Sequence, residues 1–148
     1  MNCKKDTGPQ LASDVIVIRR ALDPELGLET NPTSARPYLV VLSGLPGTGK
    51  SHFARRLARR LPLVVVGSDR ARKALMPKPK YTREEHLRVF SACHRLIEEL
   101  LAQGWAVVFD ATNLTEGFRQ PLLDLARRQR APTQIILLTA PLKVIWRR

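Results

Sequence analysis

The sequence predicts an α/β fold in which a parallel sheet carries helices on both faces. From Pro37 onward, short runs rich in β-branched residues alternate with segments whose apolar residues recur at helical spacing. A glycine-rich segment also separates the first such run from the first helical segment. This alternation is typical of strand–helix–strand units, which build parallel sheets. The expected strands are residues 38–42, 63–67, 105–110 and 133–140.

A long helix is expected between the second and third strands, over residues 82–103. Thr82 and Glu85 have the spacing of a capping box at its start, and Gly104 is a typical helix stop. Helical spacing predicts that its apolar residues face the core: Leu87, Phe90, Cys93, Leu96, Ile97, Leu100 and Leu101. We therefore expect a buried thiol at Cys93 rather than a reactive one.

The length of 148 residues suits one domain with a real core. We expect residues 37–148 to form this domain, and residues 1–36 to be an N-terminal extension and linker of unknown role. Within the extension, residues 13–27 fit either a short helix capped by Ser13 or an extra strand. Because no apolar run approaches the roughly 20 residues of a membrane span, we expect no membrane association and a cytoplasmic location.

The formal net charge of +12 is the strongest feature of the composition. A phosphate-rich partner such as nucleic acid would explain this charge. A general bias toward arginine, with solvated arginine pairs on a helix face, explains it equally well. The two cysteines and three histidines show no metal-ligand spacing, so no zinc site is expected. The sequence does not indicate the oligomeric state.

The glycine-rich segment GLPGTGKS, residues 44–51, fits the phosphate-binding pattern G-x-x-x-x-G-K-[ST] at every fixed position. It lies between a strand and a helix, which is the context of the P-loop NTPase fold. Lys50 is expected to reach the β- and γ-phosphates of ATP, and the Ser51 hydroxyl to bind Mg²⁺. The residues expected to bind ATP are Gly44, Pro46, Gly47, Thr48, Gly49, Lys50, Ser51 and His52.

The segment after the second strand, GSDRARKAL, carries Asp69 and Arg72 one helical turn apart. Ligands bind at the carboxyl ends of the strands in an open parallel sheet. A carboxylate there can accept a proton from an attacking hydroxyl, and a guanidinium can hold a phosphate of the acceptor. The alternative is structural: Ser68 or Asp69 caps the next helix, and Arg72 is solvated.

The third strand ends in Asp110, which has the position of a Walker B carboxylate and is the second expected Mg²⁺ ligand. The next residue is Ala111, where motor-type ATPases carry an acid that activates water. A GTPase is also disfavoured, since neither D-x-x-G nor N-K-x-D follows. Asn113 is expected to hydrogen-bond the acceptor or to orient Asp110. Arg119 is expected either to reach a phosphate or to lie on the following helix.

Three segments together, GLPGTGKS, SDRAR and VVFDATNLTEGFR, resemble the small P-loop kinases of the AAA_33 type, typified by polynucleotide 5′-hydroxyl kinases. The resemblance covers about residues 37–148. It implies that Asp69 is the general base and that Arg72 contacts a phosphate of the acceptor strand. It also implies that Lys50 and Ser51 serve ATP and Mg²⁺, and that Asp110 completes the site.

In the family that the sequence resembles, an arginine-bearing lid and usually a fifth strand follow the segment IILLTA. This sequence ends at VIWRR. The resemblance therefore implies that the last strand and the lid are missing, either from a fragment or from a natively truncated protein.

Three functions remain open on the sequence alone. The first is an ATP-dependent kinase acting on a nucleic-acid 5′-hydroxyl or a nucleotide. The second is a nucleotide-binding module without transferase activity. The third is a kinase for a small molecule such as a sugar acid, an antibiotic or a sugar nucleotide, with residues 78–83 and the long helix forming the acceptor pocket. Lys78, Lys80 and Tyr81 fit contact with a nucleic-acid strand or an ordinary basic loop.

Overall fold

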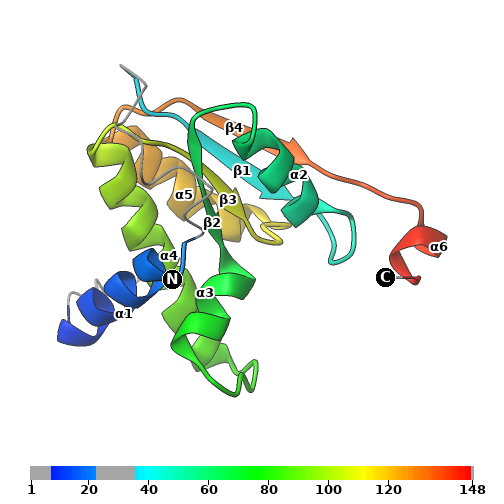
Figure 1. Cartoon of the computed structure of the whole chain (residues 1–148), viewed down its shortest axis with the longest axis horizontal. Helices are drawn as coiled ribbons and strands as arrows, with labels where there is room; N and C mark the ends of the chain where they lie inside the picture. The colour runs from blue at the N-terminus through cyan, green and yellow to red at the C-terminus, as the bar shows by residue number, and fades with distance from the viewer. Residues whose placement is uncertain (1–7, 23–35, 148) are drawn as a thin grey trace.

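The sheet has four strands, all parallel, in the order β2-β3-β1-β4 (Figure 1). The computed structural model describes residues 8–22 and 36–147. The strands are β1 (Leu39–Ser43), β2 (Leu63–Gly67), β3 (Ala106–Asp110) and β4 (Thr133–Leu137). All four lie within the predicted strand segments or one residue beyond them, so the predicted α/β architecture is confirmed.

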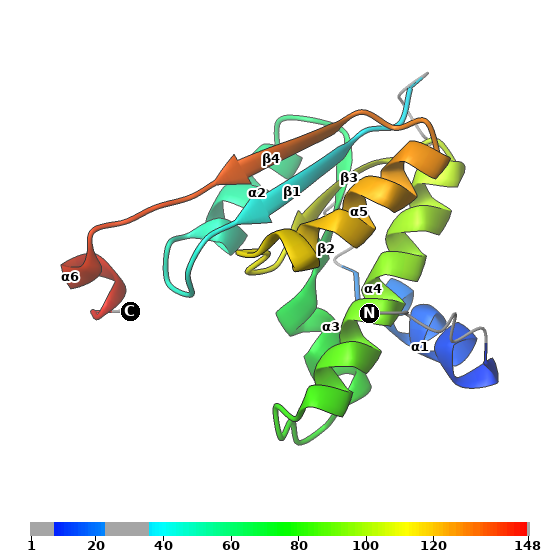
Figure 2. The same ribbon diagram turned by 180° about the vertical axis from the view of Figure 1, so that it is seen from behind.

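Six helices are present in the described residues. They are α1 (Pro9–Arg20), α2 (Lys50–Ala58), α3 (Ser68–Leu75), α4 (Arg83–Ala102), α5 (Glu116–Arg128) and α6 (Leu142–Ile145). The two opposite views show α2 on one side of the sheet and α4 and α5 on the other (Figures 1 and 2). Among these described helices, none combines the length and the apolar character needed to cross a membrane.

Side chains of the buried strands alternate between two cores. Leu39 and Val41 of β1 join the larger core, which includes buried residues of α1, α3, α4 and α5. Val40 and Leu42 point to the opposite face and pack with α2. This period of two is the geometry of an extended strand, and apolar residues on both faces explain why the sequence of β1 reads as a continuous apolar run.

The ends of α4 confirm the predicted cap and stop. The backbone N–H of Glu85 donates to the Thr82 hydroxyl at 3.3 Å. The Glu85 carboxylate accepts from the N–H groups of Lys80 and Tyr81, two residues that precede Thr82. At the other end, Gly104 has a φ of +87°. The Trp105 N–H donates to the Leu100 carbonyl at 3.0 Å, which completes a Schellman motif.

Two expectations about helices were wrong. Leu87 is 52% exposed, whereas the other six apolar residues named for the long helix are buried. The first helix is also not capped by Ser13, since α1 starts at Pro9 after Gly8 as N-cap. The Ser13 hydroxyl lies inside the helix and donates to the Pro9 carbonyl at 3.1 Å. Residues 23–35, which include most of the expected linker, lie outside the described residues.

The strand β4 lies at the edge of the sheet and is less covered than the others. Every residue of β1 is buried, whereas no residue of β4 is. Ile135 is 46% and Leu137 is 63% exposed. Ile135 pairs in register with Val41, so these exposed side chains lie on the face of the sheet opposite α2, and that face is incompletely covered near β4.

Candidate active site

The phosphate loop joins β1 to α2 and depends on glycine at three positions. Gly44, Gly47 and Gly49 have φ values of +153°, +82° and +93°. Such values strain residues with a side chain. At Gly44, an added Cβ would also lie 2.5 Å from the Leu138 carbonyl oxygen. The loop is closed by the Thr48 hydroxyl, which donates to the Leu45 carbonyl at 2.8 Å.

Lys50, the first residue of α2, reaches back into this loop. Its Nζ donates to the Leu45 carbonyl at 2.9 Å, and the residue is only 9% exposed. Burial lowers the pKa of Lys50, while the negative charges of Asp110 and Asp69 act in the opposite direction. The ammonium group thus lies at the centre of the loop with two carboxylates near it, which is a suitable position for contacting a phosphate chain.

Of the predicted catalytic and metal-binding residues, the structure brings Lys50, Ser51, Asp69 and Asp110 to one cavity of about 270 Å³. Asp110 ends β3, and Asp69 lies in the first turn of α3, directly after β2. Parallel pairing of Gly67 with Asp110 places these two strand ends side by side. The residues that line the cavity are Gly47, Gly49, Lys50, Ser51, His52, Ser68, Asp69, Asp110, Ala111 and Thr112.

Asp110 is half-buried at this cavity. Burial raises the pKa of its carboxyl group. A hydrogen bond from Ser51 and the positive charge of Lys50 oppose this rise, and the charge of Asp69 adds to it. A hydroxyl and a carboxylate in contact at the end of a phosphate loop are oxygen donors of the kind that Mg²⁺ prefers, with phosphate oxygens and water completing its shell. Ser51 and Asp110 therefore fit a magnesium ion.

Arg72 does not line this cavity, nor is it solvated. It is 7% exposed and lies between α3 and α4. Its Nη1 is 3.8 Å from a carboxylate oxygen of Glu85, and its Cζ lies 5.1 Å from the centre of the Tyr81 ring. The N-cap of α3 is Gly67, with no side-chain hydrogen bond, so the capping role considered for Ser68 or Asp69 is not observed.

Asn113 and Arg119 stabilise the loop that follows β3. Asn113 is 1% exposed, and its amide nitrogen donates to the Leu42 carbonyl at 2.9 Å. Its Oδ1 is buried without a hydrogen-bond partner in the part of the chain that the structure describes. Arg119 donates to the carbonyls of Asn113 and Leu114 at 3.0 and 2.7 Å. Contact of either side chain with an acceptor therefore stays a prediction.

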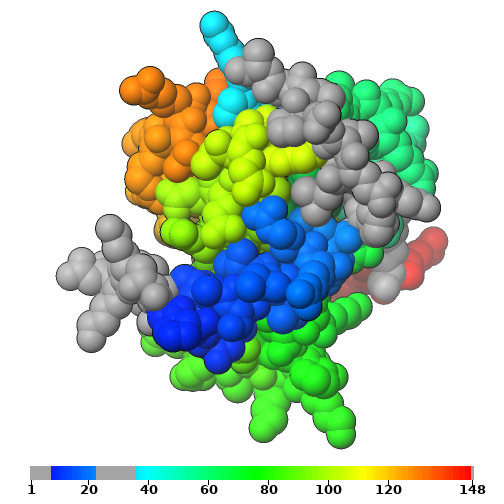
Figure 3. Space-filling view, turned by 60° about the vertical axis from the view of Figure 1, so that its left-hand side comes forward, coloured from blue at the N-terminus to red at the C-terminus, as the bar shows by residue number. Residues whose placement is uncertain are grey.

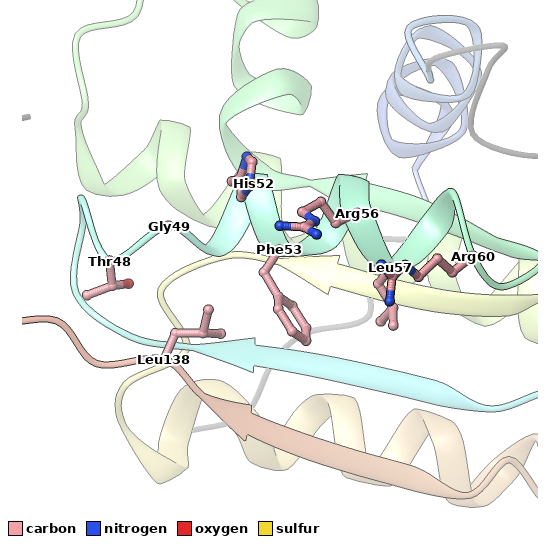
Figure 4. A pocket seen from close by; sticks show the side chains of 8 residues that line it. All are labelled: Thr48, Gly49, His52, Phe53, Arg56, Leu57, Arg60 and Leu138. Carbon is pink, nitrogen blue, oxygen red and sulfur yellow. The ribbon is translucent and has the colours of Figure 1, made fainter.

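A second, larger cavity of about 640 Å³ lies on the α2 side of the phosphate loop (Figure 4). Gly49 and His52 line both cavities, so the two adjoin. The lining residues of this groove are Thr48, Gly49, His52, Phe53, Arg56, Leu57, Arg60 and Leu138. Sequence reasoning missed Phe53, Arg56, Leu57 and Arg60 as site residues, although helical spacing places the first three on one face of α2, and Arg60 follows just after its end. No local pattern indicates Leu138, which directly follows β4.

A glycine-rich loop between the first strand and its helix, facing two carboxylates at neighbouring strand ends, defines a P-loop nucleotide-binding protein. Residues 39–148 match the AAA_33 family, described as an AAA domain. The chain belongs to this family, and its fold is that of the small P-loop kinases, as its motifs predict.

A relative, the L-seryl-tRNA(Sec) kinase of Methanococcus maripaludis, is 30% identical to this chain over 115 residues. The match covers 74% of this chain and 44% of that protein. A chain of the Pnkp1/Rnl/Hen1 complex superposes with a TM-score of 0.69 and 26% identity. That match covers 80% of this chain and 41% of the other. This chain therefore spans less than half the length of either relative.

The APS kinase CysC of Mycobacterium tuberculosis, solved with AMPPNP and APS, superposes with a TM-score of 0.63. The match covers 76% of this chain and 68% of the CysC chain, and the two sequences are 19% identical. At this identity, the likeness shows a common fold.

Proposed function

We propose that this chain is an ATP-dependent kinase that transfers the γ-phosphate to a hydroxyl acceptor, with a polynucleotide 5′-hydroxyl or a nucleotide as the first choice. One observation carries the proposal. Asp69 lines the same cavity as Lys50, Ser51 and Asp110, so a proton acceptor faces the end of the phosphate loop. The residue after Asp110 is Ala111, which offers no carboxylate to activate water.

In the proposed reaction, Asp69 accepts the proton of the acceptor hydroxyl as its oxygen attacks the γ-phosphorus. A new P–O bond forms to the acceptor, the bond between the γ-phosphorus and the bridging oxygen breaks, and ADP leaves. Lys50 and the loop N–H groups hold the phosphates in line. A magnesium ion held by Ser51 and Asp110 would neutralise part of the phosphate charge.

The two adjoining cavities suggest how ATP lies. If the γ-phosphate faces Asp69 and Asp110, the nucleoside must leave the loop on the side of Gly49 and His52. The groove begins there, and its walls combine the apolar surface of Phe53 with the guanidinium group of Arg56. Such a surface suits a stacked base. We therefore place the adenosine in the groove.

The choice of acceptor rests on relatives more than 25% identical to this chain. One is named for phosphorylating seryl-tRNA, and the other belongs to an assembly containing Pnkp1. A basic chain suits a polyanionic acceptor of this kind. We accordingly propose acceptors whose hydroxyl is attached to RNA or DNA, and place a free small molecule second.

Incubation with γ-labelled ATP, Mg²⁺ and a panel of acceptors tests the proposal. The panel holds 5′-hydroxyl RNA and DNA oligonucleotides, nucleosides and sugar acids. We expect label in an oligonucleotide with the wild type, and none with Lys50→Ala or Asp69→Asn. Asp124→Asn removes a carboxylate of α5 that lines neither cavity, so it serves as the control and should retain transfer.

Other outcomes of the labelling experiment would favour another function or another base. Label in a sugar acid alone would establish the small-molecule kinase instead. Transfer that survives Asp69→Asn would refute Asp69 as the base. Binding of ATP without transfer to any acceptor would favour a nucleotide-binding module.

A further inference from the structure

The helix α1 packs across α3, which carries Arg72 and the proposed base Asp69, and across α4; these two helices, with residues 78–83, are called the acceptor side of the site. In the space-filling view, α1 lies against both α3 and α4 (Figure 3). Val15 and Ile18 of α1 are buried in the same core as Ala71 of α3 and Val89 of α4. The family match begins at residue 39, so α1 precedes the matched segment. Its contacts indicate what this helix does.

A buried carboxylate joins α1 to α4. Asp14 is 3% exposed, and its side-chain oxygens accept hydrogen bonds from Nε and Nη2 of Arg88, both at 2.7 Å. Gln10 donates to the same carboxylate at 2.8 Å. Because a buried charge is costly unless it is paired and hydrogen-bonded, this arrangement specifies where α1 and α4 meet. Arg19 and Glu99 form a second link between the helices at 3.2 Å.

Arg88 lies one turn after Glu85 on the same face of α4. Glu85 is the residue that organises the surroundings of Arg72. Its carboxylate lies 3.8 Å from Arg72 and accepts the N–H groups of Lys80 and Tyr81 at 3.0 and 2.8 Å. The Tyr81 ring in turn lies against the Arg72 guanidinium group. The start of α4 and the residues before it therefore contact Arg72 through both Glu85 and Tyr81.

We propose that Asp14 is a positioning residue for the acceptor side of the site. By holding Arg88, it fixes the first two turns of α4, and with them Glu85, Tyr81 and the orientation of Arg72 on α3. The consequence for phosphate transfer rests on the kinase function proposed above, whereas the structural coupling from Asp14 to Glu85 does not. If α1 were only a stabilising brace, its loss would lower the stability of the whole fold evenly.

Residue-resolved amide hydrogen exchange on the full chain tests the coupling without any substrate. In Asp14→Asn, the amides of Lys80 and Tyr81 should exchange about tenfold faster, since a weakened charged hydrogen bond loosens this region locally. The amide of Val41 in β1 should be unaffected. Glu98→Gln is the matched control, because it breaks a salt bridge of α4 with Arg128 and leaves Asp14 in place. Unchanged exchange at Lys80 and Tyr81, or an equal change at Val41, would overturn the proposal.

Steady-state kinetics with a 5′-hydroxyl oligonucleotide provide the second measurement. Asp14→Asn should raise the KM for the oligonucleotide about tenfold and leave the KM for ATP unchanged, because the loosened helices lie on the acceptor side only. Equal rises in both KM values, or none, would contradict the proposal. If the wild type phosphorylates no acceptor at all, the kinase function fails, and the exchange experiment alone decides the role of Asp14.

A second variant covers the case in which Asp14→Asn does not fold. Arg88→Lys changes a side chain that is 41% exposed and keeps its charge. A lysine ammonium cannot reproduce the paired Nε and Nη2 contacts. The same faster exchange at Lys80 and Tyr81 is expected, and its absence would count against the proposal in the same way.

Discussion

Replacing Gly44 with alanine should destabilise the protein through the backbone alone. Gly44 has a φ of +153°, which strains a residue with a side chain by about 1–3 kcal/mol. The new Cβ would lie 2.5 Å from the Leu138 carbonyl oxygen. That oxygen cannot retreat easily, because the Leu138 N–H donates to the Ser43 carbonyl at 2.8 Å. Overpacking of this kind lowers the free energy of unfolding by a further amount of about 1–3 kcal/mol.

These effects together predict a loss of about 2–6 kcal/mol, or roughly 6–18 °C in Tm for a domain of this size. Differential scanning calorimetry of the wild type and Gly44→Ala measures the shift. Gly117→Ala is the control, since Gly117 lies in α5 with no heavy atom closer than 3.9 Å to an added Cβ. There alanine should be neutral or slightly stabilising. A Gly44→Ala protein melting within about 2 °C of the wild type would show that the loop relaxes around the new Cβ and would refute the expected strain.

Three further outcomes follow from burial and pKa. Leu96→Ala, in the core, should lower the free energy of unfolding in urea by about 2–5 kcal/mol, whereas Leu87→Ala, at a half-exposed position, should change it by no more than about 0.5 kcal/mol. Asp110→Asn should melt at the same temperature or higher while losing phosphate transfer, because burial raises the pKa of this carboxyl group and its ionised form costs stability at neutral pH. The hydrogen bond from Arg88 lowers the pKa of Asp14, so the stability that its carboxylate contributes is complete above about pH 4 and is lost as the pH falls. The Tm difference between the wild type and Asp14→Asn should therefore shrink from pH 6 to about pH 3, and a constant difference would contradict this assignment.

The elements that the sequence predicts correctly depend on neighbours in the chain. The phosphate loop follows from glycines and a lysine at fixed spacing, and the start and end of α4 follow from Thr82 and Gly104. Parallel pairing then brings Asp69 and Asp110 together, because residues at the carboxyl ends of neighbouring parallel strands share one edge. These features are local, or follow from a general rule of parallel sheets.

Other features depend on which surfaces meet, and no pattern in the chain indicates them. Helical spacing placed Leu87 in the core, yet α4 extends beyond the sheet at its start and leaves this residue exposed. The same packing buries Arg72 against Glu85 and Tyr81.

Asp14 and Arg88 are the clearest example of a contact that the sequence does not predict. They are 74 residues apart and pair only when α1 docks on α4. The sequence by itself thus determined the phosphate-binding loop, the strands and the main helix ends, since local backbone and side-chain chemistry suffices for them. Only the tertiary structure decided which charges are buried and paired, because desolvation and pairing depend on what the folded chain brings alongside each group.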